Sequence, residues 1–563
     1  MPRSRLLALT FSICLVGNAV SASGQARPPE ASSTQPAGEE LPAGLILPPL
    51  PQPPLAAELT PPPSGFALEF AQHLSTEGRL RVADKADRTA LKQFYEERQN
   101  EPVWVTPTGF SPAAMAVLAE IARADAWGLD ASVFRLPALT QGAELTREQR
   151  AVAEVALSLA VLEYARHARG GRTNPLTLSR NLDRKPQLLD PRSVIEAAAS
   201  TDSPNAYLRA LHPQHPQFER LRQAYLSLKR SDPPLVEQVV HTKGKGSKGK
   251  SKKKRTVAKA PTGSNLRTLL VNMEQWRWMP EDLGSFYVWV NIPEYTVRVV
   301  KAERVIHSER VVVGRASTQT PVFSHEMEQV IFHPYWGVPD SIKTNELLPS
   351  LARGNIGVLE RQNLRISYRG RDINPASVDW TKADMRKFHV YQPPGSGNAL
   401  GIVKFRFPNK HDVYMHDTPS KSLFNESARA FSHGCMRVRD PLKLAELVLA
   451  EDRGWTAGRV TAAVQRGPKD NQINLTTKVP VHMTYFTAWV EDDGKLRIYG
   501  DVYGHENRIA LGVAGKAHLI KQERPLTPAP PARRKRERVA PPEQTAFTNS
   551  RITKGWMRGV FQY

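Results

Sequence analysis

The sequence predicts an α+β protein with a helical N-terminal domain followed by a β-rich domain. Apolar residues recur at helical spacing across residues 65–239. From residue 263 to about residue 520, short segments rich in β-branched and aromatic residues alternate with turn sequences. A Lys/Gly-rich linker at residues 240–262 separates the two regions. The chain of 563 residues is also too long for one ordinary domain.

Residues 1–22 have the pattern of a secretory signal peptide. Two arginines precede a mostly apolar run, Leu6–Val16, and the small residues of Val20–Ala22 suit signal peptidase. The alternative is an uncleaved membrane anchor, although the apolar run is shorter than the roughly 20 residues that span a bilayer. We therefore expect export. Residues 23–64 are rich in Pro, Ala and Ser, and we expect them to form an extended tether.

The helical domain contains several helix start and stop signals. Asp87 is expected to cap a first helix, and Ser111-Pro112 supplies a cap followed by proline at the first helical position. Residues 151–169 predict a further helix that ends at Gly170-Gly171, and residues 207–229 form a third amphipathic stretch. No residues in this domain are spaced in the pattern of a catalytic motif.

The β-rich domain begins with three candidate strands, at residues 285–292, 295–300 and 310–314. A final strand pair at residues 483–490 and 495–502 turns at Asp492-Asp493-Gly494.

The positive charge is concentrated in two segments outside the predicted domains. The net charge is +22; nine basic residues lie between Lys243 and Lys259, and a further net +5 lies between Lys521 and Arg538 in a Pro-rich tail, residues 521–563. These runs lack interleaved aromatic residues, so we expect no nucleic-acid partner. After export, contacts with anionic wall polymer or a membrane surface are one interpretation, and solvated linkers are the other.

Cysteine content singles out one thiol. The sequence has 2 Cys, and Cys14 lies within the predicted signal peptide. The exported chain then retains only Cys435, which has no partner for an intramolecular disulfide. Such a cysteine is either a small buried hydrophobe or a reactive nucleophile.

The residues around Cys435 favour the nucleophile. Cys435 lies in the segment Ser432-His433-Gly434-Cys435-Met436-Arg437, and His416 precedes it by 19 residues. A thiol attacks carbonyl groups as the thiolate, which an adjacent imidazole favours. Gly434 would allow backbone amides to approach an incoming carbonyl oxygen. Arg437 would bind a carboxylate or form a structural ion pair.

Two neighbouring features complete the local interpretation. Asp440-Pro441 is expected to cap a helix over residues 442–451, which would fix the loop that carries Cys435. A zinc site is the alternative for this cluster, but zinc prefers three or four protein ligands and only His416, His433 and Cys435 are candidates. We therefore expect neither a metal nor a cofactor.

The Ser-His-Gly-Cys motif with its upstream histidine resembles the catalytic signature of the L,D-transpeptidases, which have a YkuD-like catalytic domain. The similarity is closest to the large, multidomain Gram-negative type, in which a helical scaffold domain precedes the catalytic domain. It implies a periplasmic location and a catalytic domain at residues 263–520. The segments that carry the resemblance beyond the motif are residues 272–278, 288–293, 313–314, 320–324 and 334–339.

The resemblance also implies roles for individual residues. Cys435 would be the nucleophile, and His416 would be the base, held by a backbone carbonyl that we assign to Asp417. Residues 345–395 would form an inserted capping segment. The expected site-shaping, oxyanion-stabilising and substrate-binding residues are Ser432, His433, Gly434, Tyr414 and Arg437.

The implied activity is the formation of cross-links between diaminopimelate residues of peptidoglycan. A donor tetrapeptide would form a thioester with Cys435, and the diaminopimelate amine of a second stem peptide would accept it. Carbapenem-type inhibitors would be recognised by the same thiol. A wall endopeptidase that uses water as acceptor and a non-enzymatic wall-binding scaffold are the alternatives. The sequence leaves open whether the acceptor is a stem peptide, a free D-amino acid or an outer-membrane protein.

Overall fold

The computed structural model describes residues 65–75, 84–230, 235–239 and 262–521. The predicted signal peptide and tether, and nearly all of the basic linker and of the tail, lie outside the described residues. Within these ranges, no helix combines the length and apolarity needed to cross a membrane. The predicted α+β class is confirmed, because a helical region precedes a β-rich one.

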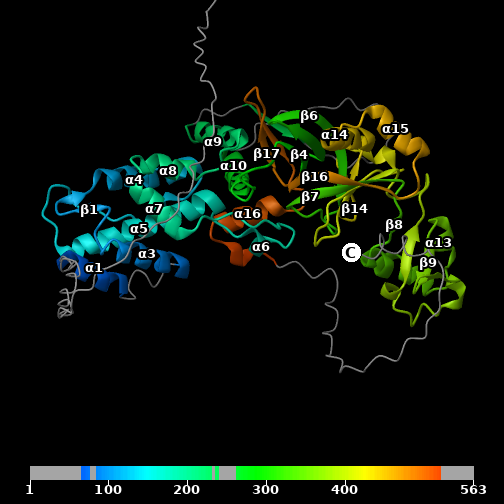
Figure 1. Cartoon of the computed structure of the whole chain (residues 1–563), viewed down its shortest axis with the longest axis horizontal. Coiled ribbons are helices and arrows are strands. Elements are labelled where there is room, and N and C mark those ends of the chain that lie inside the picture. Colours follow the sequence, from blue (N-terminus) through cyan, green and yellow to red (C-terminus); the bar gives the residue numbers. More distant parts are fainter. Residues whose placement is uncertain (1–64, 76–83, 231–234, 240–261, 522–563) are drawn as a thin grey trace, which may run out of the picture. The chain divides into compact units, whose positions relative to one another are not determined.

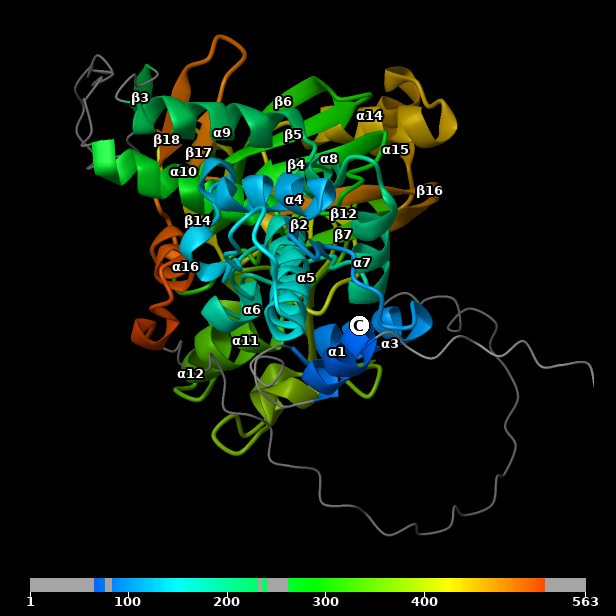
Figure 2. The same ribbon diagram turned by 90° about the vertical axis from the view of Figure 1, so that its left-hand side faces the viewer.

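Helices α1, α3, α4, α5, α7 and α8 of the N-terminal region lie together (Figures 1 and 2). Their buried apolar side chains form one core. Helix α5 is buried along most of its length and contacts α1, α3, α4, α7 and α8. A short hairpin, β1 (Val105–Thr106) and β2 (Gly109–Phe110), also contacts α5 and α4. The helices are α1 (Gly65–Ser75), α3 (Lys85–Glu97), α4 (Pro112–Ala122), α5 (Arg147–Gly170), α6 (Pro175–Leu178), α7 (Pro191–Ser200), α8 (Pro204–Ala210) and α9 (Pro216–Lys229).

Two of the predicted helix boundaries are wrong for identifiable reasons. Asp84, not Asp87, caps α3 by accepting a hydrogen bond from the Ala86 amide, while Asp87 is buried and pairs with Arg166. Residues 207–229 form two helices, α8 and α9, because the prolines at 213 and 216 interrupt the helical pattern. The cap at Ser111 is confirmed, since its side chain accepts from the Ala114 amide at 3.2 Å.

The β-rich region is built on a nine-stranded sheet in the order β14-β6-β15-β13-β12-β7-β16-β4-β5. Strand β5 also pairs with β6, so the sheet closes on itself. The three predicted N-terminal strands correspond to β4, β5 and β6. The strand bounds are β4 (Phe286–Asn291), β5 (Thr296–Lys301), β6 (Arg304–Gly314), β7 (Ser324–Phe332), β12 (Val403–Arg406), β13 (Met415–His416), β14 (Ala430–Ser432), β15 (Met436–Val438) and β16 (Asn471–Thr484).

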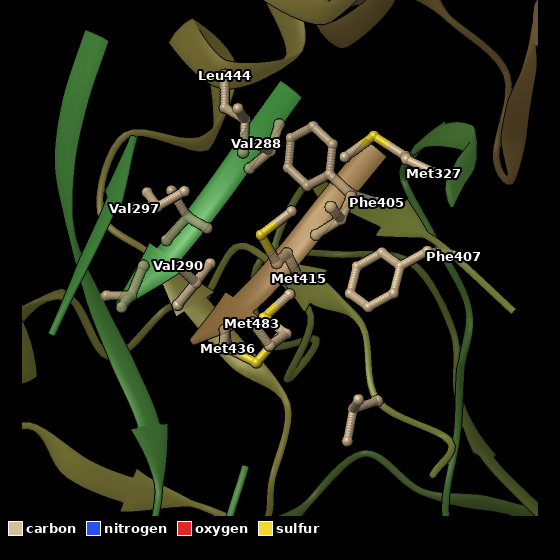
Figure 3. Close-up of a cluster of buried hydrophobic side chains, with 14 of the residues drawn as sticks. Val288, Val290, Val297, Met327, Phe405, Phe407, Met415, Met436, Leu444 and Met483 are labelled. Carbon is tan, nitrogen blue, oxygen red and sulfur yellow. The ribbon is translucent and has the colours of Figure 1, made fainter. Parts of the chain in front are cut away.

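Apolar side chains fill the interior of this sheet (Figure 3). Phe405, Met415 and Met436, from β12, β13 and β15, are fully buried in this cluster. Helix α14 (Pro441–Arg453) contributes Leu444 to the same core, and α15 (Ala457–Arg466) follows it. Asp440 caps α14 as predicted, because its side chain accepts from the Lys443 amide at 3.2 Å.

A smaller sheet joins residues that are distant in the sequence. Strands β17 (Ala488–Val490) and β18 (Leu496–Tyr499) form the predicted hairpin, although residues 483–484 belong to β16. Strand β3 (Val236–Val239) pairs in parallel with β18. Helices α9 and α10 (Thr262–Trp276) pack against this sheet through a shared apolar cluster. Helix α16 (His505–Val513) contacts α10.

Residues 336–392 form a small unit inserted between β7 and β12. Its four-stranded sheet has the order β10-β9-β11-β8, and it has an apolar cluster of its own that includes Leu347, Ile366 and Val390. We call it the capping unit; it contains most of the predicted capping segment. Its main elements are β8 (Trp336–Gly337), α11 (Asp340–Ile342), the π-helix η3 (Lys343–Leu347), α12 (Leu348–Leu351), α13 (Gly357–Arg361), β9 (Arg365–Tyr368), β10 (Arg371–Asp372) and β11 (His389–Gln392) (Figure 1).

Candidate active site

Strands β12, β13 and β15 carry the candidate catalytic residues. Met415 of β13 is level with Phe405 of β12 and with Met436 of β15, and all three side chains point into the core. Because successive side chains of a strand point to opposite faces, the residues on either side of these three lie on the outer face. The strand pairing therefore places His416 and Cys435 on the same face, as diagonal neighbours about 7 Å apart.

His416 is buried and is held in one tautomer. Its Nδ1–H donates to the backbone carbonyl of Asp417, so Nε2 keeps its lone pair. Burial and, next, the Arg437 guanidinium lower the pKa of His416 to about 3. The imidazole is therefore neutral at neutral pH and can accept a proton through Nε2. The carbonyl of Asp417 is the contact that the family resemblance implies.

The Asp417 carboxylate fixes the backbone that supplies this carbonyl. Its Oδ2 accepts from the Ile402 amide at 3.0 Å, and Lys421 Nζ lies 2.5 Å from its Oδ1. Gly401 adopts φ +61°, and a Cβ at that position would lie 2.2 Å from Asp417 Oδ2. Only glycine therefore allows the carboxylate to pack this closely against the loop.

Cys435 is partly accessible to solvent, and its Sγ lies 3.8 Å from the Asp412 carbonyl oxygen. Burial raises the pKa of the Cys435 thiol to about 11, although contacts with Tyr414 and the Lys404 charge oppose this rise. Among the described residues, no hydrogen bond joins Cys435 to His416. The resting thiol is therefore neutral, whereas the sequence favours a thiolate stabilised by the imidazole. The geometry instead suits a general base that takes the thiol proton during attack.

The other residues of the motif support the loop that carries Cys435. Ser432 Oγ donates to the Cys435 carbonyl at 2.6 Å, and Thr320 Oγ1 donates to the Gly434 carbonyl at 2.6 Å. Gly434 has φ +118°, a conformation that other residues rarely adopt. Its amide is directed to Ser432 Oγ at 3.3 Å, so this expected oxyanion donor is engaged at rest.

His433 faces the capping unit and not the thiol. Its Nε2 lies 2.5 Å from Glu346 Oε1 on η3, and Arg315 approaches the same nitrogen. Arg315 is also 3.9 Å from Glu346. The motif histidine thus connects the catalytic loop to the capping unit. Neither Arg315 nor Glu346 had a sequence signal that indicated this role.

Two basic side chains lie beside His416. Lys404 and Arg437 are each in register with His416, and their charges lower its pKa. Arg437 is half-buried, and among the described residues no acceptor lies within hydrogen-bond distance of its buried Nε. Tyr414 lies at van der Waals distance from His416, with ring centroids 5.6 Å apart. Within the described ranges, no three His, Cys, Asp or Glu side chains are grouped closely enough to hold a metal ion.

Comparison with known families identifies both regions. Residues 89–224 match the model of a scaffold domain. Residues 285–481 match the model of the L,D-transpeptidase catalytic domain. Cys435 and His416 both lie within the matched residues of this domain. The predicted resemblance to L,D-transpeptidases with a scaffold domain is confirmed by these matches. The predicted domain limits stay predictions.

A curated relative agrees with this family. A Haemophilus influenzae protein named "Putative L,D-transpeptidase" is 33% identical over 244 residues, which cover 43% of this chain and 49% of the relative. The chain thus spans about half the length of that relative.

Solved structures of L,D-transpeptidases are much more distant. An enzyme from Mycobacterium smegmatis is 12% identical over 36% of this chain and 58% of its own, with a TM-score of 0.17. An L,D-transpeptidase in complex with imipenem has the same identity and TM-score, over 36% of this chain and 59% of that one. At these TM-scores the superpositions add nothing to the fold assignment.

Proposed function

We propose that this chain is an exported peptidoglycan L,D-transpeptidase that links diaminopimelate residues through a thioester on Cys435. The observation that carries the proposal is the pairing of β13 with β15 within the L,D-transpeptidase domain. This pairing brings a partly accessible thiol and a neutral imidazole whose Nε2 keeps its lone pair to one face of the sheet. A periplasmic location belongs to the same proposal and is supported by the N-terminal sequence pattern.

The first half-reaction forms the acyl-enzyme. Cys435 Sγ attacks the carbonyl at the L-centre of diaminopimelate in a donor tetrapeptide, and His416 Nε2 takes the thiol proton. The C–N bond then breaks, and the imidazolium gives this proton to the nitrogen of the departing D-alanine. The expected oxyanion donors are the backbone amides of Gly434 and Cys435, which requires the Gly434 amide to leave Ser432 Oγ.

The second half-reaction forms the cross-link. The side-chain amine of a second diaminopimelate attacks the thioester, and His416 takes a proton from this amine. The C–S bond breaks, and the proton returns to the sulfur. The peptide bond of the donor supplies the energy, so no nucleotide is consumed. We further propose that carbapenems acylate the same thiol.

Muropeptides rich in tetrapeptides provide the test. The full chain and its Cys435→Ala variant are incubated with these muropeptides, and the products are analysed by mass spectrometry. We expect cross-linked dimers with the parent chain alone. Dimers from both proteins would remove Cys435 from the mechanism. Release of D-alanine without any dimer would identify a hydrolase, and an imipenem adduct that Cys435→Ala abolishes would locate the inhibitor.

A further inference from the structure

A row of three polar side chains crosses strands β12, β13 and β15. Lys404 is in register with His416, and His416 is in register with Arg437. Residues in register on neighbouring strands point to the same face of a sheet. The candidate base therefore has a cationic side chain on each side, and the row contains no acidic residue.

Lys404 occupies an unusual position for a lysine. The residue is 9% exposed, and its ammonium lies 4.3 Å from the centre of the Tyr414 ring. Its charge lowers the pKa of both Cys435 and His416, so it acts on the two reacting side chains.

Arg437 adds a second cation on the other side of the base. Burial lowers its pKa, and the opposing influence is the Cys435 thiol; no carboxylate among the described residues raises it. Its Nε has no acceptor among the described residues, and a planar guanidinium is suited to bind a planar anion such as a carboxylate. Neighbouring strands are about 4.8 Å apart, so the α-carbons of Lys404 and Arg437 are separated by about 10 Å. Two long side chains can converge on one anion across that distance.

The proposed reaction places one carboxylate near this row. His416 must reach the scissile nitrogen in order to protonate the leaving D-alanine. The α-carboxylate of that D-alanine is attached to the carbon bonded to the same nitrogen. When the scissile carbonyl lies at Cys435 Sγ, the carboxylate therefore lies beside His416.

We propose that Lys404 acts together with Arg437 to bind the terminal carboxylate of the leaving D-amino acid. The inference rests on the proposed function. It makes Lys404 a specificity-determining residue, because a donor whose chain continues past this residue, or whose carboxylate is amidated, would lose the charge that the two cations bind.

Three donor peptides test this assignment. One is the tetrapeptide with its free terminal carboxylate, the second ends in D-alaninamide, and the third has lysine in place of diaminopimelate and so lacks the side-chain carboxylate. The rate of D-alanine or D-alaninamide release gives kcat/KM for each donor. We expect the parent chain to prefer the free carboxylate over the amide by about 10- to 100-fold, as for hydrogen bonds to charged groups.

Variants of Lys404 separate specificity from folding. Lys404→Met should reduce the preference for the free carboxylate about tenfold, and Lys404→Arg should restore most of it. Lys478→Met, an exposed lysine on β16, is the matched control and should keep the parent's preference. Equal losses on both donors in Lys404→Met, with the preference intact, would overturn the proposal. A loss in Lys404→Met that affects both diaminopimelate donors and spares the lysine-containing donor would assign the cations to the diaminopimelate side-chain carboxylate and would also overturn it.

A binding experiment separates this inference from the proposed function. In the Cys435→Ala background, calorimetry measures tetrapeptide affinity with and without Lys404→Met. We expect the free carboxylate to bind more tightly than the amide, and Lys404→Met to abolish that difference. If Cys435→Ala and the Cys435→Ala/Lys404→Met double variant show the same difference in affinity between the free carboxylate and the amide, the role of Lys404 is refuted, even if the parent chain forms dimers. A preference for the free carboxylate over the amide that disappears in Lys404→Met would support the role of Lys404, even if no dimers form.

Discussion

The thiol of Cys435 and the imidazole of His416 are both neutral at rest, because burial disfavours the charged form of each. A neutral pair differs from a resting thiolate–imidazolium pair in how its reactivity depends on pH. Alkylation by iodoacetamide requires the thiolate, so its rate follows the ionisation of the thiol.

We expect the rate of Cys435 alkylation to rise about tenfold per pH unit between pH 7 and pH 9, because the pKa of the thiol is raised to about 11. Stopped-time alkylation followed by intact-protein mass spectrometry measures this rate, and Cys435→Ala provides the background. A rate that is constant over the same range would show that the thiolate already forms at rest.

The contact between Gly401 and Asp417 makes a second prediction at this scale. In Gly401→Ala, the new Cβ would lie 2.2 Å from Asp417 Oδ2, at a φ of +61°. We expect a loss of about 1–3 kcal/mol in the free energy of unfolding and at least a tenfold fall in kcat, as the carbonyl that orients His416 moves. Gly397→Ala is the control, since a Cβ there meets no atom within 4 Å. An unchanged kcat in Gly401→Ala would show that this carbonyl is not needed.

Several site residues could be predicted from the sequence, and others could not. The motif and the upstream histidine indicated Cys435 and His416 because the chemistry needs those residue types. Lys404 carries no such signal. Its position beside His416 depends on the register of two strands whose segments are separated by a loop. Likewise, Glu346 reaches His433 only because the capping unit folds as it does.

Among the elements, helix α5 organises the scaffold region through Glu154. This buried carboxylate accepts from the amides of Val103, Trp104 and Val105, at 2.6, 2.9 and 3.0 Å, and from the Tyr95 hydroxyl at 2.6 Å. Burial raises the pKa of Glu154, whereas these hydrogen bonds oppose the rise. The carboxylate thus pairs backbone groups that would otherwise be buried without a partner.

We expect Glu154→Leu to destabilise the scaffold region by about 3–5 kcal/mol, because three amides and a hydroxyl lose their acceptor. Glu154→Gln retains an acceptor and should cost less. Chemical denaturation measures both, and Glu148→Leu, at an exposed position of the same helix, is the control. Equal stability of Glu154→Leu and Glu148→Leu would show that the network contributes little.

Local sequence signals predicted where helices begin better than they predicted which strands pair with each other. Serine and proline at the start of α4, and aspartate and proline at the start of α14, act over one helical turn and were sufficient. The parallel pairing of β3 with β18 joins residues about 260 positions apart, and no local pattern specifies it. The wrong prediction of Asp87 as the cap of α3 has the same cause. Asp84 and Asp87 are both suitable capping residues, and only the packing of the folded chain buries Asp87.

For the whole molecule, buried histidines link stability to pH. Burial lowers the pKa of His482 to about 4 and that of His505 to about 3. The folded chain therefore keeps these rings neutral, while an unfolded chain takes up protons below the usual histidine pKa of 6.5. Their contribution to stability is fully present above pH 6.5 and is lost as the pH falls from there towards 3.

His505 offers a specific test of this dependence. Its ring is fully buried against Tyr485, and among the described residues neither ring nitrogen has a hydrogen-bond partner. We expect His505→Phe to flatten the decline in Tm between pH 7.5 and pH 4, recovering on the order of 3 kcal/mol at pH 4. Thermal unfolding at several pH values measures this, with the exposed His518→Phe as the control. Parallel curves for parent and variant would exclude His505 as a contributor.

The alternation of side chains along β12, β13 and β15 has an evolutionary consequence. The same three strands present Phe405, Met415 and Met436 inward and Lys404, His416 and Arg437 outward. A slip of one residue would exchange the two sets, so selection against misfolding also protects the reactive face. The chain between the histidine and the cysteine, by contrast, does not set their distance. Insertions and deletions at the exposed residues Asn425 and Glu426 of this segment should be tolerated among homologues, whereas those within the strands should be purged.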